Sequence, residues 1–176
     1  MSATHDDLLN ASPWVKRFTS QIPKGGMVLD LACGGGRHAR LMADMGYSVL
    51  AVDQDIGTIE AHKNPLITAR CFDLEKDQWP FDQDLFSGIV VTNYLFRPRL
   101  DCLPEMLVSG GVLIYETFAQ GNADFGKPSN PNFLLKTGEL LGLTARHGLK
   151  VLAYEDIYVD EPKPAMVQRL CALKAG

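Results

Sequence analysis

Short apolar runs alternate with amphipathic stretches along this chain, and the two patterns predict different elements. Apolar runs of four to eight residues bounded by turn residues are typical of buried strands, whereas apolar positions three and four residues apart are typical of helices. We expect strands over residues 27–32, 48–52, 66–71, 85–92, 112–118, 150–159 and 166–174, and helices over residues 13–22, 37–45, 55–63, 99–108 and 136–146.

Strands that alternate with helices form parallel sheets with helices on both faces. The last two predicted strands are joined by a short linker without a helix, so they are expected to pair antiparallel. The predicted fold is therefore an α/β three-layer sandwich around a mixed, mostly parallel seven-stranded sheet, with the last strand antiparallel. Ligands of such sheets bind at the carboxyl ends of the strands, where the strand order reverses.

The length of 176 residues fits a single domain over residues 1–176. We expect residues 1–26 to form a helical lid segment of that domain. Lys and Arg total 17 and Asp and Glu total 21, a balance of −4 that disfavours a nucleic-acid partner. The chain has no run of 18 apolar residues and no basic segment leading an apolar one at its start, so we expect no membrane association and a cytoplasmic protein.

The four cysteines are scattered along the chain, with no Cys-x-x-Cys pair and no histidine at zinc spacing. Reduced thiols and the absence of a metal site are the plain expectations.

A glycine-rich turn follows the first predicted strand. Gly34, Gly35 and Gly36 let a ligand approach the backbone closely, and Asp53 ends the second strand nineteen residues after Gly34. An acidic residue at that place binds the two hydroxyls of a ribose, so the pair predicts a nucleoside ligand. The spacing Gly34-x-Gly36-x-x-Ala39 also fits a dinucleotide site. Asp30, however, would repel a pyrophosphate and suits a ligand with ammonium and sulfonium charges.

These segments together resemble class I S-adenosylmethionine-dependent methyltransferases from about Trp14 to Leu173. LDLACGGGRH is similar to the first motif of that family, VLAVDQD to its second-strand motif, and CFDLEKDQWPF, LFSGIVVTNYL and SGGVLIYETF to its next three strand segments. The Ala32-Cys-Gly form and the GKPSNPNFLL segment are most similar to small bacterial members of the tellurite-resistance type. Ala32 stands where many members have glycine.

The resemblance implies a role for S-adenosylmethionine as cofactor and assigns its contacts. The turn would lie along the methionine and ribose, Asp30 would act on the amino group, and Asp53 would hold the ribose. Residues after the next strands would surround the adenine and the methionine end. The implied cofactor set is Asp30, Ala32, Cys33, Gly34, Gly35, Gly36, Asp53, Gln54, Phe72, Asp73, Leu74 and Asn93.

Five other polar and aromatic residues have two interpretations each. Each could contact the ligand or the acceptor, either from a lid or from a strand end. Alternatively, each could pack in the core, cap a loop or lie solvated on the surface. The five residues are Trp14, Arg17, Tyr94, Arg97 and Glu116. For His38, packing is favoured over chemistry.

The segment Gly121–Lys127 has the spacing of a phosphate-binding loop. Pro128 replaces the Ser or Thr that would hold magnesium, and Asp124 places a carboxylate inside the loop. We interpret this segment as a rim over the site.

The predicted function is methyl transfer from S-adenosylmethionine to a small-molecule acceptor by in-line displacement, for which no catalytic residue is assigned. A general base is needed only if the acceptor must lose a proton, and Glu116, Tyr94 and His38 are then the candidates. Two alternatives remain: an NAD-dependent oxidoreductase of Rossmann type and a non-catalytic S-adenosylmethionine-binding protein. The acceptor and the oligomeric state stay open.

Overall fold

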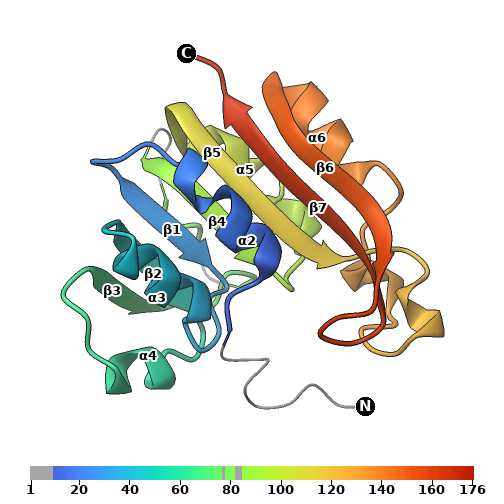
Figure 1. Cartoon of the computed structure of the whole chain (residues 1–176), viewed down its shortest axis with the longest axis horizontal. Helices are drawn as coiled ribbons and strands as arrows, with labels where there is room; N and C mark the ends of the chain where they lie inside the picture. The colour runs from blue at the N-terminus through green and yellow to red at the C-terminus, as the bar shows by residue number, and fades with distance from the viewer. Residues whose placement is uncertain (1–9, 77, 82–84) are drawn as a thin grey trace.

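A single seven-stranded sheet runs through the molecule in the order β3-β2-β1-β4-β5-β7-β6 (Figure 1). The computed structural model describes residues 10–76, 78–81 and 85–176. The strands are β1 (Met27–Leu31), β2 (Ser48–Asp53), β3 (Ile67–Cys71), β4 (Phe86–Thr92), β5 (Leu107–Phe118), β6 (Leu149–Val159) and β7 (Ala165–Lys174).

Strands β1 to β5 pair in parallel, and β7 pairs antiparallel with both β5 and β6. The predicted sheet, with its antiparallel last strand, is confirmed. The chain moves outward from β1 to β3 and then returns to place β4 beside β1. This reversal puts the carboxyl ends of β1 and β4 at the point where open α/β sheets bind ligands.

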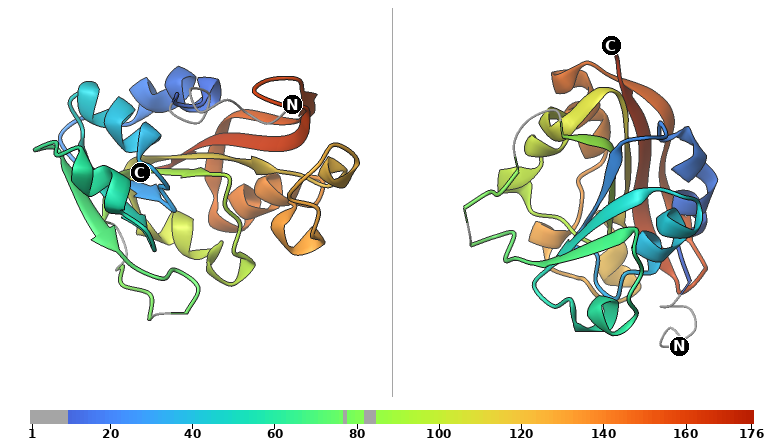
Figure 2. Two further views of the ribbon diagram at one scale, coloured as in Figure 1. Left: turned by 90° about the horizontal axis from the view of Figure 1, so that it is seen from below. Right: turned by 90° about the vertical axis from the view of Figure 1, so that its left-hand side faces the viewer.

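Helices cover both faces of the sheet (Figure 2). Apolar side chains of α2, α3 and α4 pack on one face, and those of α5 and α6 pack on the other. The described helices are α2 (Pro13–Phe18), α3 (Arg37–Asp44), α4 (Gly57–Ala61), α5 (Cys102–Met106) and α6 (Glu139–His147), with short 3₁₀ turns η1 (Thr19–Gln21), η2 (Arg97–Arg99), η3 (Asn122–Asp124) and η4 (Pro131–Phe133).

The fifth strand begins earlier than the hydrophobic pattern predicts. The predicted helix over 99–108 shrinks to η2 and α5, and β5 starts at Leu107 opposite Phe86. Gly110 and Gly111 lie inside the strand instead of forming a turn before it. Gly110 has a φ of +80°, and a Cβ on Gly111 would come within 2.8 Å of the Val108 carbonyl oxygen. The two glycines therefore carry β5 through an irregularity in its pairing with β4.

The N-terminal helix is part of the core. The Ser12 hydroxyl caps α2 by accepting from the Trp14 N–H, and Val15 and Phe18 are buried with Trp14 against the sheet. The indole Nε1 of Trp14 donates to the Leu170 carbonyl over 3.2 Å. The structure thus favours the packing reading of Trp14. Residues 1–9 of the predicted lid lie outside the described residues.

Replacement of Trp14 distinguishes a role of this side chain in core packing from a role in a lid. We expect Trp14→Ala to lower the free energy of unfolding by about 3–5 kcal/mol, because it empties a buried site. Arg17→Ala, on the exposed side of the same helix, should change it by less than about 0.5 kcal/mol. Chemical denaturation measures both. A Trp14→Ala protein of unchanged stability would contradict the packing reading.

Candidate cofactor and acceptor site

The turn between β1 and α3 has a backbone conformation that favours glycine. Gly34 and Gly36 have φ angles of +53° and +83°, and Ala32 has +54°. A Cβ on Gly36 would lie 2.6 Å from Ile59 Cγ1, whereas one on Gly34 would meet no atom within 4 Å. Gly36 is therefore required by packing against α4, and Gly34 faces open space beside the end of β1. The turn leaves room for a ligand to lie along its backbone.

Asp53 is joined to this turn directly. Its Oδ2 accepts from the Gly34 N–H over 2.9 Å, and its Oδ1 accepts from the Asp55 N–H over 3.1 Å. The turn is also fixed by the Cys33 N–H, which donates to the Val52 carbonyl over 3.0 Å. The glycine turn and the acidic residue that the sequence pairs at a distance are thus in contact.

Asp30 is a buried carboxylate without a full set of partners. Its side chain is 1% exposed, and Oδ2 has no hydrogen-bond partner in the described part of the chain. Burial raises its pKa from 3.8 to about 7, opposed by a hydrogen bond from the Ala39 backbone and by the charge of Arg37. A cationic group that reached Oδ2 would offset this cost of burial.

The end of β3 supplies the next residues of the predicted set. The Phe72 N–H donates to the Asp53 carbonyl over 2.9 Å, which ties the two strand ends together. Asp73 Oδ1 accepts from the backbone N–H groups of Glu75 and Lys76. Leu74 is buried, and Gln54 is exposed. These residues therefore lie together on the β2 side of the turn.

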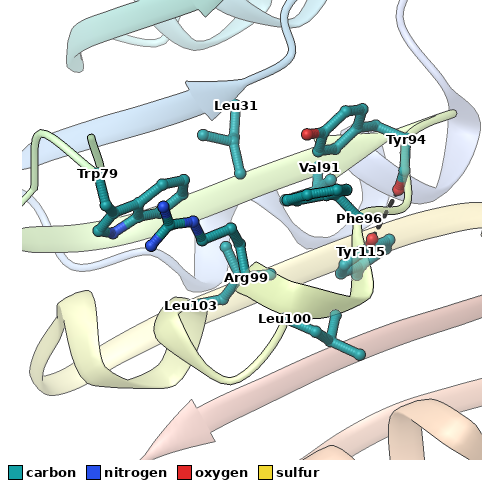
Figure 3. A pocket seen from close by; sticks show the side chains of 9 residues that line it. All are labelled: Leu31, Trp79, Val91, Tyr94, Phe96, Arg99, Leu100, Leu103 and Tyr115. Atoms are coloured by element: carbon teal, nitrogen blue, oxygen red, sulfur yellow. Dashed lines mark hydrogen bonds between the residues drawn. The ribbon is translucent and has the colours of Figure 1, made fainter. Parts of the chain in front are cut away.

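Asn93 and Tyr94 follow β4. Asn93 is exposed with a φ of +52°, and its N–H donates to the Glu116 carbonyl over 2.9 Å. The Tyr94 hydroxyl is buried, and no described residue bonds to it. Its pKa is raised, first by burial and then by the charges of Glu75, Asp73 and Asp53, so it lies among the predicted cofactor residues. Figure 3 shows the Tyr94 ring over Phe96, with its hydroxyl turned to the side of Leu31.

Tyr94 lines two spaces. The smaller, drawn in Figure 3, measures about 10 Å³, enough for a single water at most. The larger, called the cavity in front of Tyr94, measures about 340 Å³ and follows the carboxyl ends of β4 and β5. That volume is in the range of small-molecule sites. The larger cavity is lined by Glu75, Asn93, Tyr94, Leu95, Thr117, Phe118, Pro128 and Phe133.

Glu116 is held by other groups. Its Oε1 accepts from the Ser12 hydroxyl over 2.7 Å, and its Oε2 pairs with the Arg169 guanidinium. These two contacts favour the interpretation of Glu116 as a structural group over its interpretation as a base.

Both ring nitrogens of His38 are likewise engaged in hydrogen bonds. Its Nε2 accepts from the Ser12 N–H over 3.0 Å, so in the neutral ring the proton sits on Nδ1, which faces the Thr92 hydroxyl at 3.3 Å. Burial lowers the pKa of His38 to about 3, so it stays neutral. The packing role that the sequence favours is the one its geometry supports.

Neither arginine of the sequence prediction reaches toward the turn. Arg17 is exposed on α2, with its guanidinium 4.9 Å from the Phe18 ring centroid. Arg97 donates to Glu139 over 2.7 Å and to the carbonyls of Asn132 and Leu134 over 3.0 and 2.7 Å. Arg97 therefore fastens the segment after β4 to the loop that follows β5.

Sequence reasoning missed part of the cavity wall. Thr117 and Phe118 end β5 and obey the same strand-end rule that found Asn93, so the rule could have found them. Phe133, Pro128 and Glu75 carried no such signal, because their places depend on how loops return to the sheet. Pro128 and Phe133 follow the segment that we interpret as a rim, whereas the described lining contains no residue of 121–127.

Comparison with known proteins bears on this site. Residues 28–108 match the sequence profile of a family described as a methyltransferase domain. Residues 28–108 therefore have the sequence of a methyltransferase domain. The class I methyltransferase fold that the motifs predict is confirmed by similar solved structures.

Three known proteins are similar to this chain, one in sequence and two in fold. YqeM of Bacillus subtilis (strain 168), named as a methyltransferase, is 33% identical over 55 residues, which are 30% of this chain and 22% of YqeM. This chain thus spans about a fifth of that relative. An S-adenosylmethionine-dependent methyltransferase from Mesorhizobium loti has a TM-score of 0.71 and 18% identity, covering 94% of this chain and 100% of the other. TehB from Haemophilus influenzae has a TM-score of 0.68 and 21% identity, covering 99% of this chain and 63% of TehB.

In the described ranges of this chain, no helix has the length and apolar character to cross a bilayer. Within the same ranges, no three His, Cys, Asp or Glu side chains gather as metal ligands.

Asp30 makes the stability of the domain depend on pH. Its pKa of about 7 in the folded protein lies above the ordinary 3.8, so its charge opposes folding fully above pH 7 and not at all below pH 4. We expect Asp30→Asn to raise the free energy of unfolding at pH 8 by more than about 1 kcal/mol, and by progressively less as the pH falls toward 4.

Chemical denaturation of both proteins between pH 4 and 8 measures this difference. A gain or loss that does not vary with pH would contradict the assignment of a raised pKa to Asp30.

Proposed function

We propose that this chain transfers the methyl group of S-adenosylmethionine to a small-molecule acceptor by in-line displacement. The observation that carries the proposal is the buried Asp30 carboxylate with an unpartnered oxygen, beside a turn that leaves open space at Gly34. S-adenosylmethionine is a cation with an ammonium and a sulfonium group, so it can satisfy this carboxylate. A pyrophosphate would instead add negative charge beside it.

The residues around the turn fit the rest of the cofactor. The backbone from Ala32 through Cys33 to Gly36 would line the methionine and the ribose. Asp53, held in place by two backbone N–H groups, would accept from the ribose hydroxyls with its remaining lone pairs. The adenine would lie between Gln54 and the residues after β3, and the methionine end near Asn93. The adenine residues are Phe72, Asp73 and Leu74.

The cofactor supplies an activated methyl group, and the chain supplies orientation and exclusion of water. Among the groups weighed as bases, His38 stays neutral with both ring nitrogens in hydrogen bonds, and Glu116 is paired through both oxygens. The raised pKa of Tyr94 keeps its hydroxyl protonated. None of these three groups is therefore assigned the role of a base.

The cavity in front of Tyr94 supports a small acceptor. Its volume of about 340 Å³ accommodates a compact organic molecule, and the loop after β5 limits its extent. The free thiols of Cys33, Cys71, Cys102 and Cys171 are compatible with a cytoplasmic location.

Replacement of Asp53 tests the cofactor site. We expect Asp53→Ala to weaken S-adenosylmethionine binding more than tenfold, which is about 1.4 kcal/mol, because it removes charge-assisted contacts to the ribose. Asp44→Ala, at the far end of α3, should leave the affinity unchanged. Isothermal titration calorimetry on folded proteins measures both dissociation constants.

The same titration with NADH tests the oxidoreductase alternative. Binding of NADH without binding of S-adenosylmethionine would overturn the proposed function. Binding of S-adenosylmethionine with no methylated product from any acceptor would leave a non-catalytic binding protein as the better account.

A further inference from the structure

We propose that the acceptor is a small, flat, neutral aromatic nitrogen compound, and that Phe133 determines its selection. The proposal rests on the proposed methyl transfer and adds the class of acceptor. It concerns the cavity of about 340 Å³ in front of Tyr94.

Three of the eight residues that line this cavity are aromatic. Tyr94 comes from the end of β4, Phe118 from the end of β5, and Phe133 from the loop that follows β5. Phe133 is 49% exposed although its ring lines a cavity. A flat apolar molecule between these rings would remove apolar surface from water on both of its sides.

The position of Phe133 is fixed by its neighbours in the chain. Arg97 donates to the carbonyl oxygens of Asn132 and Leu134, the residues on either side of Phe133. The same guanidinium is paired with Glu139, which is the first residue of α6. The loop therefore holds Phe133 at the cavity before any ligand arrives, which lowers the entropy cost of binding.

The charge of the cavity disfavours an anion. Glu75 is the charged residue in its described lining, and that lining contains no Lys, Arg or His. Arg97 is committed to Glu139, and Lys163 lies on the ring of Phe118 at 5.6 Å without lining the cavity. An oxyanion or thiolate would thus face a carboxylate with no cationic side chain in the described lining to balance it, and only the sulfonium of the proposed cofactor would offset that repulsion. A neutral molecule meets no such penalty.

The chemistry of the surrounding groups favours nitrogen as the attacking atom. A phenol would have to lose its proton, and the two candidate bases, Glu116 and His38, are both engaged in hydrogen bonds. A nitrogen lone pair needs no such help. It forms the bond to the methyl carbon while the carbon–sulfur bond breaks and leaves its electron pair on sulfur. The positive charge moves from sulfur to nitrogen, where the carboxylate of Glu75 can stabilise it; an N–H acceptor then releases its proton to water.

Two phenylalanines of one loop provide a matched test. Phe125 is 46% exposed, stands eight residues before Phe133 and contacts Tyr158 instead of the cavity. Both Phe133→Ala and Phe125→Ala should fold, because both rings are already half exposed. We expect Phe133→Ala to raise KM for the acceptor at least tenfold with an unchanged dissociation constant for S-adenosylmethionine, and Phe125→Ala to change neither.

The acceptor class is tested on the unmodified chain by formation of S-adenosylhomocysteine. The probes are quinoline, imidazole, aniline, phenol, 2-mercaptoethanol and tellurite, each at equal concentration. We expect turnover of the nitrogen compounds, and a several-fold lower kcat for them in Glu75→Gln but not in Glu60→Gln, on α4. Glu60 is exposed and outside the cavity lining.

A chain that does not bind S-adenosylmethionine would refute the proposed function itself. A chain that binds it but methylates only phenol, thiol or tellurite, or none of the probes, would overturn the acceptor proposal alone. Equal effects of Phe133→Ala and Phe125→Ala on the acceptor KM would overturn the role of Phe133.

Discussion

The buried carboxylate of Asp30 is the constraint on which the rest of the site depends. It lies in the central strand β1, where burial raises its pKa to about 7 and no described group bonds to Oδ2. Such a group lowers the stability of the free protein, and a bound cation would offset that cost. The turn after β1, its hydrogen bond to Asp53 and the open space at Gly34 define where that cation can enter.

Two other ionisable groups near the site, Glu116 and Arg97, are engaged in ion pairs. Glu116 joins Ser12 of the N-terminal segment to Arg169 of β7, and Arg97 joins the segment after β4 to α6. These bonds fix the segments around the cavity in place. The reactivity is then supplied by the methyl donor. Under the proposed function, the acceptor is selected by the shape of the cavity, by contact with its aromatic side chains and by the carboxylate of Glu75.

The sheet and the contact between the glycine turn and Asp53 could be predicted because they follow local rules. A glycine turn after a buried strand and an acid after the next strand are visible in sequence, and Gly34 and Asp53 are hydrogen bonded. The state of Glu116 could not be predicted, because its pairing needs the antiparallel register that sets it opposite Arg169. The burial of Trp14 likewise depends on where α2 docks, and the place of Phe133 on how a long loop returns to the sheet.

The most direct measurement is the number of protons released when S-adenosylmethionine binds, obtained by calorimetry at pH 7 in buffers of different ionisation enthalpy. If the cofactor's cation pairs with Asp30, the carboxyl gives up its proton on binding, about half a proton per cofactor at a pKa of about 7. The account predicts this release in the unmodified chain and its loss in Asp30→Asn. Equal proton release in the two proteins would contradict the account.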